Sequence, residues 1–218
     1  MSIAKYEKLN FLDVETYIAA SKRIILASNS PRRRELLENV GIKFEIIPDN
    51  TPEPMDGSLP PWETVMMLAK FKGDNVAKTI EGDALIIAAD TVVAIDDTIL
   101  GKPENAEDAF EMLSRLSGRA HNVYTGVYVR ENSDEKSAIF YEKTEVCFKS
   151  LDINEIKDYI NTGEPMDKAG SYGIQGGAAL FAEKMSGDYY NVMGLPVCRL
   201  GQLLKQIAPD LERMEGNE

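Results

Sequence analysis

Histidine and cysteine are scarce in this sequence, and their scarcity excludes several classes of enzyme site. His121 is the only histidine among 218 residues, so one chain cannot assemble a zinc site with two or three imidazoles. A Ser-His-Asp hydrolase would have to use the same histidine, and no Gly-x-Ser-x-Gly motif accompanies it. Cys147 and Cys198 are far apart in sequence and support neither a disulfide framework nor a thiolate zinc site. If a metal takes part, its ligands are carboxylates, and oxygen ligands favour Mg²⁺ or Mn²⁺.

Long apolar runs and glycine-rich nucleotide motifs are also missing. The longest uninterrupted apolar run, residues 84–89, has six residues, whereas a membrane-spanning helix needs about 20. Residues 1–16 carry several charges and lack the apolar core of a secretory signal, so we expect a cytoplasmic protein without a membrane partner. Neither Gly-x-Gly-x-x-Gly nor Gly-x-x-x-x-Gly-Lys-Ser/Thr occurs, which leaves Rossmann-type and P-loop nucleotide sites unsupported.

Positive charge is in the minority. Lys and Arg total 24 against 36 Asp and Glu, a net charge of −12, which disfavours binding to nucleic acid or to an anionic membrane surface. A polyanionic ligand would therefore need a local cluster of cations. The remaining composition, 44% hydrophobic and 28% charged, is typical of a folded globular protein and favours an enzyme or a binding domain.

Helical and strand patterns alternate along the chain. Apolar runs and apolar–polar alternation predict strands at residues 24–27, 42–47, 84–93 with a hairpin return at 99–100, 122–130, 137–148 and near 178–184. Helical spacing and capping residues predict helices at 31–40, 62–79, 104–116, 152–161 and 196–207, with loops at 48–61 and 164–177. Interleaved elements of this kind indicate an α/β fold, with one three-layer domain built on a mixed central sheet.

Three arginines occupy the first turn of a predicted helix that begins after Ser30 and Pro31. They are Arg32, Arg33 and Arg34, and each cation at this already positive helix end is unfavourable by roughly 0.3 to 1 kcal/mol. A bound anion would reverse that sign, because helix N–H groups and guanidinium groups both bind phosphate. We therefore predict a phosphate site here, with an ordinary solvated arginine run as the alternative.

Asp90 stands at the end of the apolar run at 84–89. A carboxylate in this position must leave the core or be held by a partner or a metal. Because ligands of open α/β sheets collect beyond strand ends, Asp90 is a candidate general base or metal ligand, and a turn aspartate is the alternative. Glu53, in the proline-rich loop, is a candidate second oxygen donor, although an acidic loop residue on its own is more often solvated.

Two lysines extend the set of candidates. Lys72 lies near the middle of the long predicted helix, and Lys102 follows the predicted hairpin. Each alone is typical of a surface lysine. If the fold brings both beside Arg32 and Arg33, four cations converge in a chain of net negative charge, and such a cluster requires an anion.

A glycine-rich loop, residues 163–176, is the last candidate region. Its Gln175 offers the amide donor and acceptor that a pyrimidine imide edge would need. A purely structural Ω-loop is the alternative.

Five motifs follow one another along the chain: LASNSPRR at 26–33, AADTVV at 88–93, GKP at 101–103, LSGRAH at 116–121 and DKAGSYGIQG at 167–176. Together they resemble the Maf family of nucleoside triphosphate pyrophosphatases, from residue 24 to about residue 204. The resemblance implies an elongated, inosine-triphosphatase-like α/β fold with a central cleft. It also implies a Maf-like domain at 22–208, preceded by an N-terminal extension at 1–21 and followed by a polar tail at 209–218. The chain departs from the family at Gly73, where alanine is common.

The resemblance implies metal-assisted attack of water on the α-phosphate of a nucleoside triphosphate, which releases pyrophosphate and the monophosphate. The subfamily resembles the dTTP/UTP type, and modified pyrimidine triphosphates are among the expected substrates. The implied catalytic residues are Asp90, which accepts the proton of the water, Lys72 and Lys102. The implied ligands of Mg²⁺ or Mn²⁺ are Asp90 and Glu53. The implied substrate-binding residues are Ser30, Arg33 and three positions linked to substrate choice, Arg32, Thr91 and Gln175.

Other functions stay open beside this one. The family's association with inhibition of cell-septum formation suggests a nucleotide-binding regulator without catalysis. Relatives that act on 7-methyl-GTP carry an extra tryptophan before the arginines, Gln where this chain has Thr91, and Glu where it has Gln175, and none of these features is present. A nucleic-acid-binding module is disfavoured by the overall negative charge. The sequence leaves open whether the protein is a monomer or a homodimer.

Overall fold

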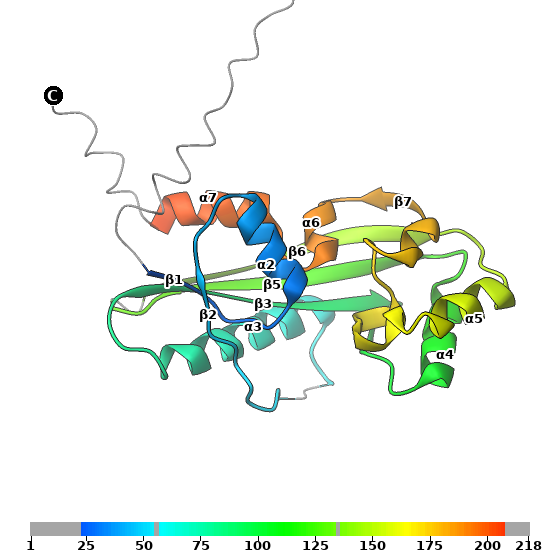
Figure 1. The fold of residues 1–218 in the computed structure, drawn as a ribbon, viewed down its shortest axis with the longest axis horizontal. Coiled ribbons are helices and arrows are strands. Elements are labelled where there is room, and N and C mark those ends of the chain that lie inside the picture. Colours follow the sequence, from blue (N-terminus) through cyan, green and yellow to red (C-terminus); the bar gives the residue numbers. More distant parts are fainter. Residues whose placement is uncertain (1–22, 55–56, 134–135, 208–218) are drawn as a thin grey trace, which may run out of the picture.

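A mixed seven-stranded sheet runs through the described part of the chain, which in this computed structural model is residues 23–54, 57–133 and 136–207 (Figure 1). The strands are β1 (Arg23–Leu26), β2 (Glu45–Ile46), β3 (Ala84–Ile95), β4 (Thr98–Leu100), β5 (Ala120–Glu131), β6 (Ser137–Phe148) and β7 (Ala182–Ser186). Their order is β2-β1-β3-β5-β6-β7, and β4 pairs with the end of β3. β1 is parallel to β2 and β3, and the remaining pairs are antiparallel. The predicted extension and polar tail lie outside the described residues.

Helices cover both faces of the sheet. They are α2 (Pro31–Asn39), α3 (Pro61–Ala77), α4 (Ala106–Leu116), α5 (Ile153–Asn161), α6 (Tyr189–Met193) and α7 (Val197–Ile207). Helix α3 lies along one face, while α2 and α7 lie on the other (Figure 1). The predicted three-layer α/β fold with a mixed sheet is therefore confirmed, and the central cleft stays a prediction. No helix in the described ranges is both long enough and apolar enough to span a membrane.

Both faces of the central strand β3 are covered by core, so its successive side chains are all apolar from Ala84 to Ala89. Ile87 packs in the core beneath α2 and α7, whereas Ile86 packs in the core against α3. Because side chains alternate along a strand, the next polar residues divide in the same way. Asp90 faces α3, where it pairs with Lys72, and Thr91 faces α2, where its hydroxyl accepts from Arg33.

Glycine allows α3 to lie directly against the sheet. Gly126 of β5 is the cross-strand partner of Asp90, and a Cβ atom added to it would lie 2.3 Å from the Val65 carbonyl oxygen of α3. A Cβ atom added to Gly73 of α3 would lie 2.5 Å from the ring of Tyr128. No side chain fits at either point, so glycine sets the distance between α3 and the strand that carries Asp90.

We expect Gly126→Ala to destabilise the fold by about 1–3 kcal/mol, because overpacking forces α3 away from the sheet. Turnover should fall as well, since α3 carries Lys72. Urea unfolding followed by circular dichroism measures the first effect. Gly201→Ala in the middle of α7 is the matched control: its added Cβ meets nothing within 4 Å, and it should be neutral or stabilising. Equal stability of the two variants would contradict this account.

Three predicted elements differ from the structure. The strand expected near 178–184 is a 3₁₀ turn at Gly177–Leu180 followed by β7, because the Ala179 N–H bonds to the Gly176 carbonyl and the Phe181 N–H bonds to the Ala178 carbonyl, which closes a turn in its first half. The short helix α6 was not predicted, although its N-cap Asp188 and the left-handed Gly194 after it are ordinary helix boundaries. The strand expected at 42–47 shrinks to the two residues of β2 at the sheet edge.

Candidate active site

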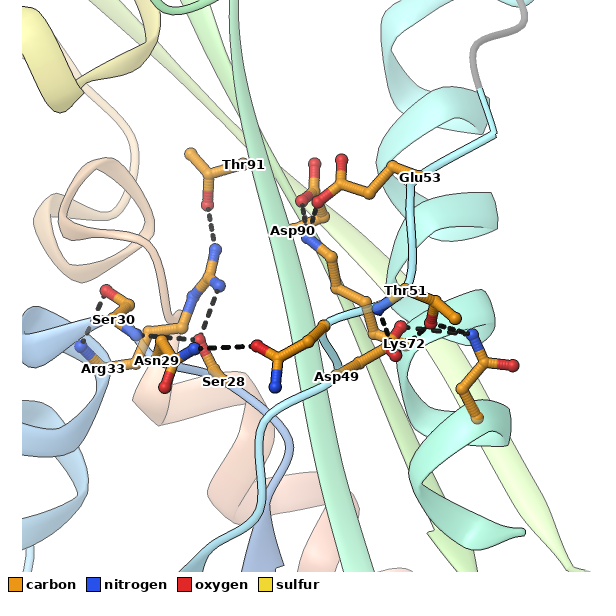
Figure 2. A network of polar contacts seen from close by, with 12 residues as sticks. Ser28, Asn29, Ser30, Arg33, Asp49, Thr51, Glu53, Lys72, Asp90 and Thr91 are labelled. Atoms are coloured by element: carbon orange, nitrogen blue, oxygen red, sulfur yellow. Dashed lines mark hydrogen bonds and ion pairs between the residues drawn. The ribbon is translucent and has the colours of Figure 1, made fainter. Parts of the chain in front are cut away.

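A half-buried lysine joins two carboxylates from different parts of the chain. Lys72 of α3 forms an ion pair with Asp90 of β3, and its Nζ lies 2.9 Å from Oε1 of Glu53 in the loop before α3 (Figure 2). The side chains of Lys72 and Asp90 are 15% and 12% exposed, whereas that of Glu53 is 45% exposed. Figure 2 shows the lysine pointing between the two carboxylates. The structure therefore brings together the predicted base, one predicted lysine and the second oxygen donor.

The environment of Asp90 favours proton uptake. Burial raises the pKa of this carboxyl above its ordinary value, and the positive charges of Lys72 and Arg33 oppose that effect without cancelling it. The nearby charge of Glu53 acts in the same direction as burial. A carboxylate with a raised pKa is a better proton acceptor at neutral pH than an ordinary aspartate.

Three hydrogen bonds hold the Arg33 guanidinium on the opposite face of β3 from Lys72. Its Nε donates to the Gly194 carbonyl at 2.8 Å, and its two terminal nitrogens donate to Ser28 Oγ at 3.1 Å and to Thr91 Oγ1 at 3.0 Å. Burial lowers the pKa of Arg33, and the charge of Asp90 acts against that shift. Because a guanidinium has five N–H donors, two remain for a ligand. Arg33 thus ties the start of α2 to Thr91.

Ser30 and Arg32 lie at the start of the same helix. Ser30 is the N-cap of α2, and its hydroxyl accepts from the backbone N–H of Arg33 at 3.5 Å. Arg32 is half-buried, and its charge contributes to lowering the pKa of Asp167, after the larger effect of the hydrogen bond from Lys168. Arg32, in the predicted phosphate-binding turn, is therefore within electrostatic range of Asp167 in the glycine-rich loop.

Lys102 and Gln175 are exposed. Among the residues that the structure describes, no hydrogen bond or ion pair joins Arg32, Lys102 or Gln175 to Asp90. Lys102 follows Gly101, whose carbonyl accepts from the Gly170 N–H at 2.9 Å, so its backbone begins beside the glycine-rich loop. Their roles toward a ligand stay predictions.

Sequence patterns missed the residues that hold Glu53 in place. Asn75, one helical turn after Lys72, donates to Thr51 Oγ1 at 2.8 Å and to Asp49 Oδ2 at 3.2 Å. The Thr51 N–H donates to Asp49 Oδ1 at 3.1 Å. This Asx turn and the three-residue spacing of Lys72 and Asn75 on one helix face are signals that the sequence contains. The network fastens the Glu53 loop to α3.

The carboxylates and Arg33 lie on the two faces of β3 at a stretch where one edge of this strand is open. On this edge, pairing with β1 ends at Ile87, and pairing with β4 begins at Val93. Between these two points no strand of the described chain pairs with β3, whereas β5 pairs with the opposite edge throughout. Asp90 and Thr91 lie in this gap, beyond the carboxyl end of β1 and beside the amino end of α2. Such positions are typical ligand sites of α/β sheets.

The two carboxylates fit a Mg²⁺ or Mn²⁺ ion that a phosphate ligand completes. Glu53 and Asp90 already converge on one cation, the Lys72 ammonium. No group of three or more His, Cys, Asp or Glu side chains in the described part of the chain is arranged to hold a metal. Mg²⁺ is commonly bound by one or two carboxylates together with substrate phosphates, so this donor set matches that ion.

Known proteins are similar to this chain in sequence over most of its length. The family model described as Maf-like protein matches residues 23–207. A dTTP/UTP pyrophosphatase of Alkaliphilus metalliredigens is 50% identical over 84% of this chain and 95% of its own length. A dTTP/UTP pyrophosphatase of Caldicellulosiruptor saccharolyticus is 47% identical over 89% of this chain and 99% of its own length. A solved HAM1 protein from Coxiella burnetii has 14% identity and a TM-score of 0.49, over 85% of this chain and 100% of that chain. The family model matches the whole described fold, and these two curated relatives are 47% and 50% identical to the chain. The chain therefore belongs to the Maf family.

Proposed function

We propose that this chain hydrolyses dTTP and UTP, and modified pyrimidine triphosphates, to the monophosphate and pyrophosphate. The observation that carries the proposal is the partly buried Asp90–Lys72 pair beside Glu53 at the open edge of β3. The names of the relatives at 47% and 50% identity support the choice of dTTP and UTP.

In the proposed reaction, Asp90 accepts a proton from the attacking water. The water oxygen bonds to the α-phosphorus, the bond from that phosphorus to the oxygen bridging the β-phosphate breaks, and pyrophosphate leaves with the electron pair. Lys72 and Arg33 lie within electrostatic range of Asp90. In this scheme Arg32 and Lys102 supply further positive charge to the leaving pyrophosphate. Ser30, Thr91 and Gln175 contribute the polar contacts that orient the nucleotide.

Glu53 and Asp90 would hold the divalent ion, Mg²⁺ or Mn²⁺. When bound, such an ion neutralises phosphate charge and makes the α-phosphorus more electrophilic. Lys72 keeps the two carboxylates close together and limits their repulsion in a partly buried setting.

We expect EDTA to abolish turnover and Mg²⁺ or Mn²⁺ to restore it. Glu53→Gln should raise the metal concentration needed for half-maximal rate by about tenfold or more, because one charged oxygen ligand is lost. Titration of the metal against pyrophosphate release measures this requirement. Glu81→Gln, at an exposed position, is the control and should leave it unchanged. Full activity in EDTA would rule out the metal.

A panel of nucleoside triphosphates with identification of both products tests the proposed function. Steady release of pyrophosphate from dTTP and UTP, at higher kcat/KM than from 7-methyl-GTP, is the expected result. Saturable binding of dTTP without product would support the non-catalytic regulator instead. Faster turnover of 7-methyl-GTP would place the chain in the other branch of the family.

A further inference from the structure

A tight turn presents Gln175. The Gly176 N–H donates to the Gly173 carbonyl at 3.0 Å, so Ile174 and Gln175 are the two central residues of a β-turn. Ile174 packs against both cores on the Thr91 face of the sheet, one containing Ala89 and the other containing Val93. The turn therefore lies over the stretch of β3 that contains Thr91, with the Gln175 side chain exposed.

Glu164 and Tyr159 hold both ends of this turn. At its start, the Gly173 N–H donates to the Tyr159 hydroxyl at 3.1 Å, and that hydroxyl donates to Glu164 Oε1 at 2.9 Å. Just after its end, the Gly177 N–H donates to Glu164 Oε2 at 3.0 Å. One carboxylate thus connects the two sides of the turn that carries Gln175.

The turn rests directly on this carboxylate. A Cβ atom added to Gly176 would lie 2.0 Å from Glu164 Oε1, and one added to Gly173 would lie 3.0 Å from the same atom. Gly176 therefore lies directly against Glu164, whereas a Cβ atom added to Gly173 would first meet Cε of Lys168, at 2.7 Å. The glycines of the loop serve a close approach between a charged side chain and the backbone.

Tyr159 is itself fixed by packing. It is 5% exposed, belongs to the core that also contains Tyr172 and Phe181, and packs edge-to-face on Phe181 with ring centroids 5.1 Å apart. The carboxylate is held in turn by its hydrogen bonds to Tyr159 and Gly177. The turn is connected to rigid core, while Gln175 itself stays free to meet a ligand.

We propose that Glu164 and Tyr159 are positioning residues for base selection, because they hold the Gln175 turn at a fixed height over Thr91. The inference rests on the proposed function, in which Gln175 pairs with the imide edge of thymine or uracil. A long, exposed amide discriminates between bases only if its backbone is held in place. Neither positioning residue touches the reacting phosphate in this scheme.

Glu164→Ala and Tyr159→Phe each remove hydrogen bonds from the set that holds the Gln175 turn, which we call the clamp. Both variants should raise KM for dTTP and UTP by about tenfold with kcat nearly unchanged, because the binding energy that is lost comes from contacts remote from the reaction. Turnover of dCTP, which lacks the imide N–H, should change less than about twofold, so the preference for dTTP falls. Glu164→Gln keeps an acceptor for Gly177 and a polar partner for Tyr159, and should restore most of the preference. Glu183→Gln, exposed on β7, is the control.

Hydrogen exchange of the Gly173 and Gly177 amides provides a readout that does not depend on activity. Both amides should exchange faster in Glu164→Ala than in the wild-type chain, and Gln175→Ala combined with Glu164→Ala should lose no more dTTP preference than Gln175→Ala alone. Faster exchange with unchanged KM and preference would overturn the inference, as would an equal loss of kcat on every substrate. If the wild-type chain releases no pyrophosphate from dTTP or UTP, the proposed function is overturned instead, and with it the pairing of Gln175 to the base. Hydrogen exchange of the Gly173 and Gly177 amides would still report whether the clamp exists.

Discussion

Asp90→Asn lowers kcat for dTTP by about 10²- to 10⁴-fold while the substrate still binds, the usual loss when a positioned general base is removed. Asparagine has nearly the same size and can keep a hydrogen bond to Lys72, but it cannot accept the proton of the attacking water. Single-turnover kinetics, together with dTTP binding by calorimetry, separate the two effects. Asp158→Asn, exposed on α5, is the matched control. Undiminished turnover by Asp90→Asn would remove the assigned base.

The pH dependence of the wild-type chain belongs to the same test. Turnover requires the ionised carboxylate, so kcat/KM should fall as the pH drops through the pKa of Asp90, and burial places that limb at higher pH than for an ordinary aspartate. The raised pKa also means that the folded state binds this proton more tightly than the unfolded state. The contribution of Asp90 to the free energy of unfolding is therefore complete below its pKa in the unfolded chain, and it is lost as the pH rises through its pKa in the folded chain. Replacing the charged group should thus not lower stability at neutral pH through this effect.

Lys72→Met destabilises the fold by about 3 kcal/mol or more, because it leaves the buried Asp90 without its ion-pair partner. Turnover should fall as well, since a cation near the phosphates is lost. Chemical unfolding monitored by fluorescence measures the stability. Lys70→Met, on the same helix, is the control: Lys70 is 55% exposed and pairs with Asp74, and such a surface pair is worth about 0.2–1 kcal/mol.

The double variant Lys72→Met with Asp90→Asn distinguishes electrostatics from packing. If the charge left unpaired on Asp90 causes the loss, removing both charges restores part of the stability, with a coupling of about 0.5–3 kcal/mol. Activity stays low, because the base is absent. Strictly additive losses would instead assign the effect of Lys72→Met to the packing of its aliphatic stem.

Local patterns predicted most of the elements. Ser30 and Pro31 signal the start of α2, and the structure confirms Ser30 as its N-cap. The apolar run before Asp90 predicts a buried strand, and β3 is buried on both faces. These features depend on residues a few positions apart, whose preferences act within a single turn or strand.

Two elements with weak local signals were predicted poorly: the strand β2 was expected to be longer, and the helix α6 was not expected. β2 exists because Ile25 and Leu26 pair with Glu45 and Ile46, and its own residues are exposed. Helix α6 has five residues, which is too short to show a helical period, and it is held by tertiary contacts such as that of Asn191 with the Val123 carbonyl.

Residue types and their places in the predicted elements identified Asp90, Lys72, Glu53 and Arg33 as candidates, but only the tertiary structure decided which of them meet. The alternation of β3 sends Asp90 toward Lys72 and Thr91 toward Arg33, and Gly126 lets α3 come close enough for the first of these pairs. Lys102 and Gln175 were candidates as well, yet no hydrogen bond or ion pair joins either of them to Asp90 in the described chain. Distances between residues far apart in sequence follow from strand order and helix packing, which no local pattern encodes.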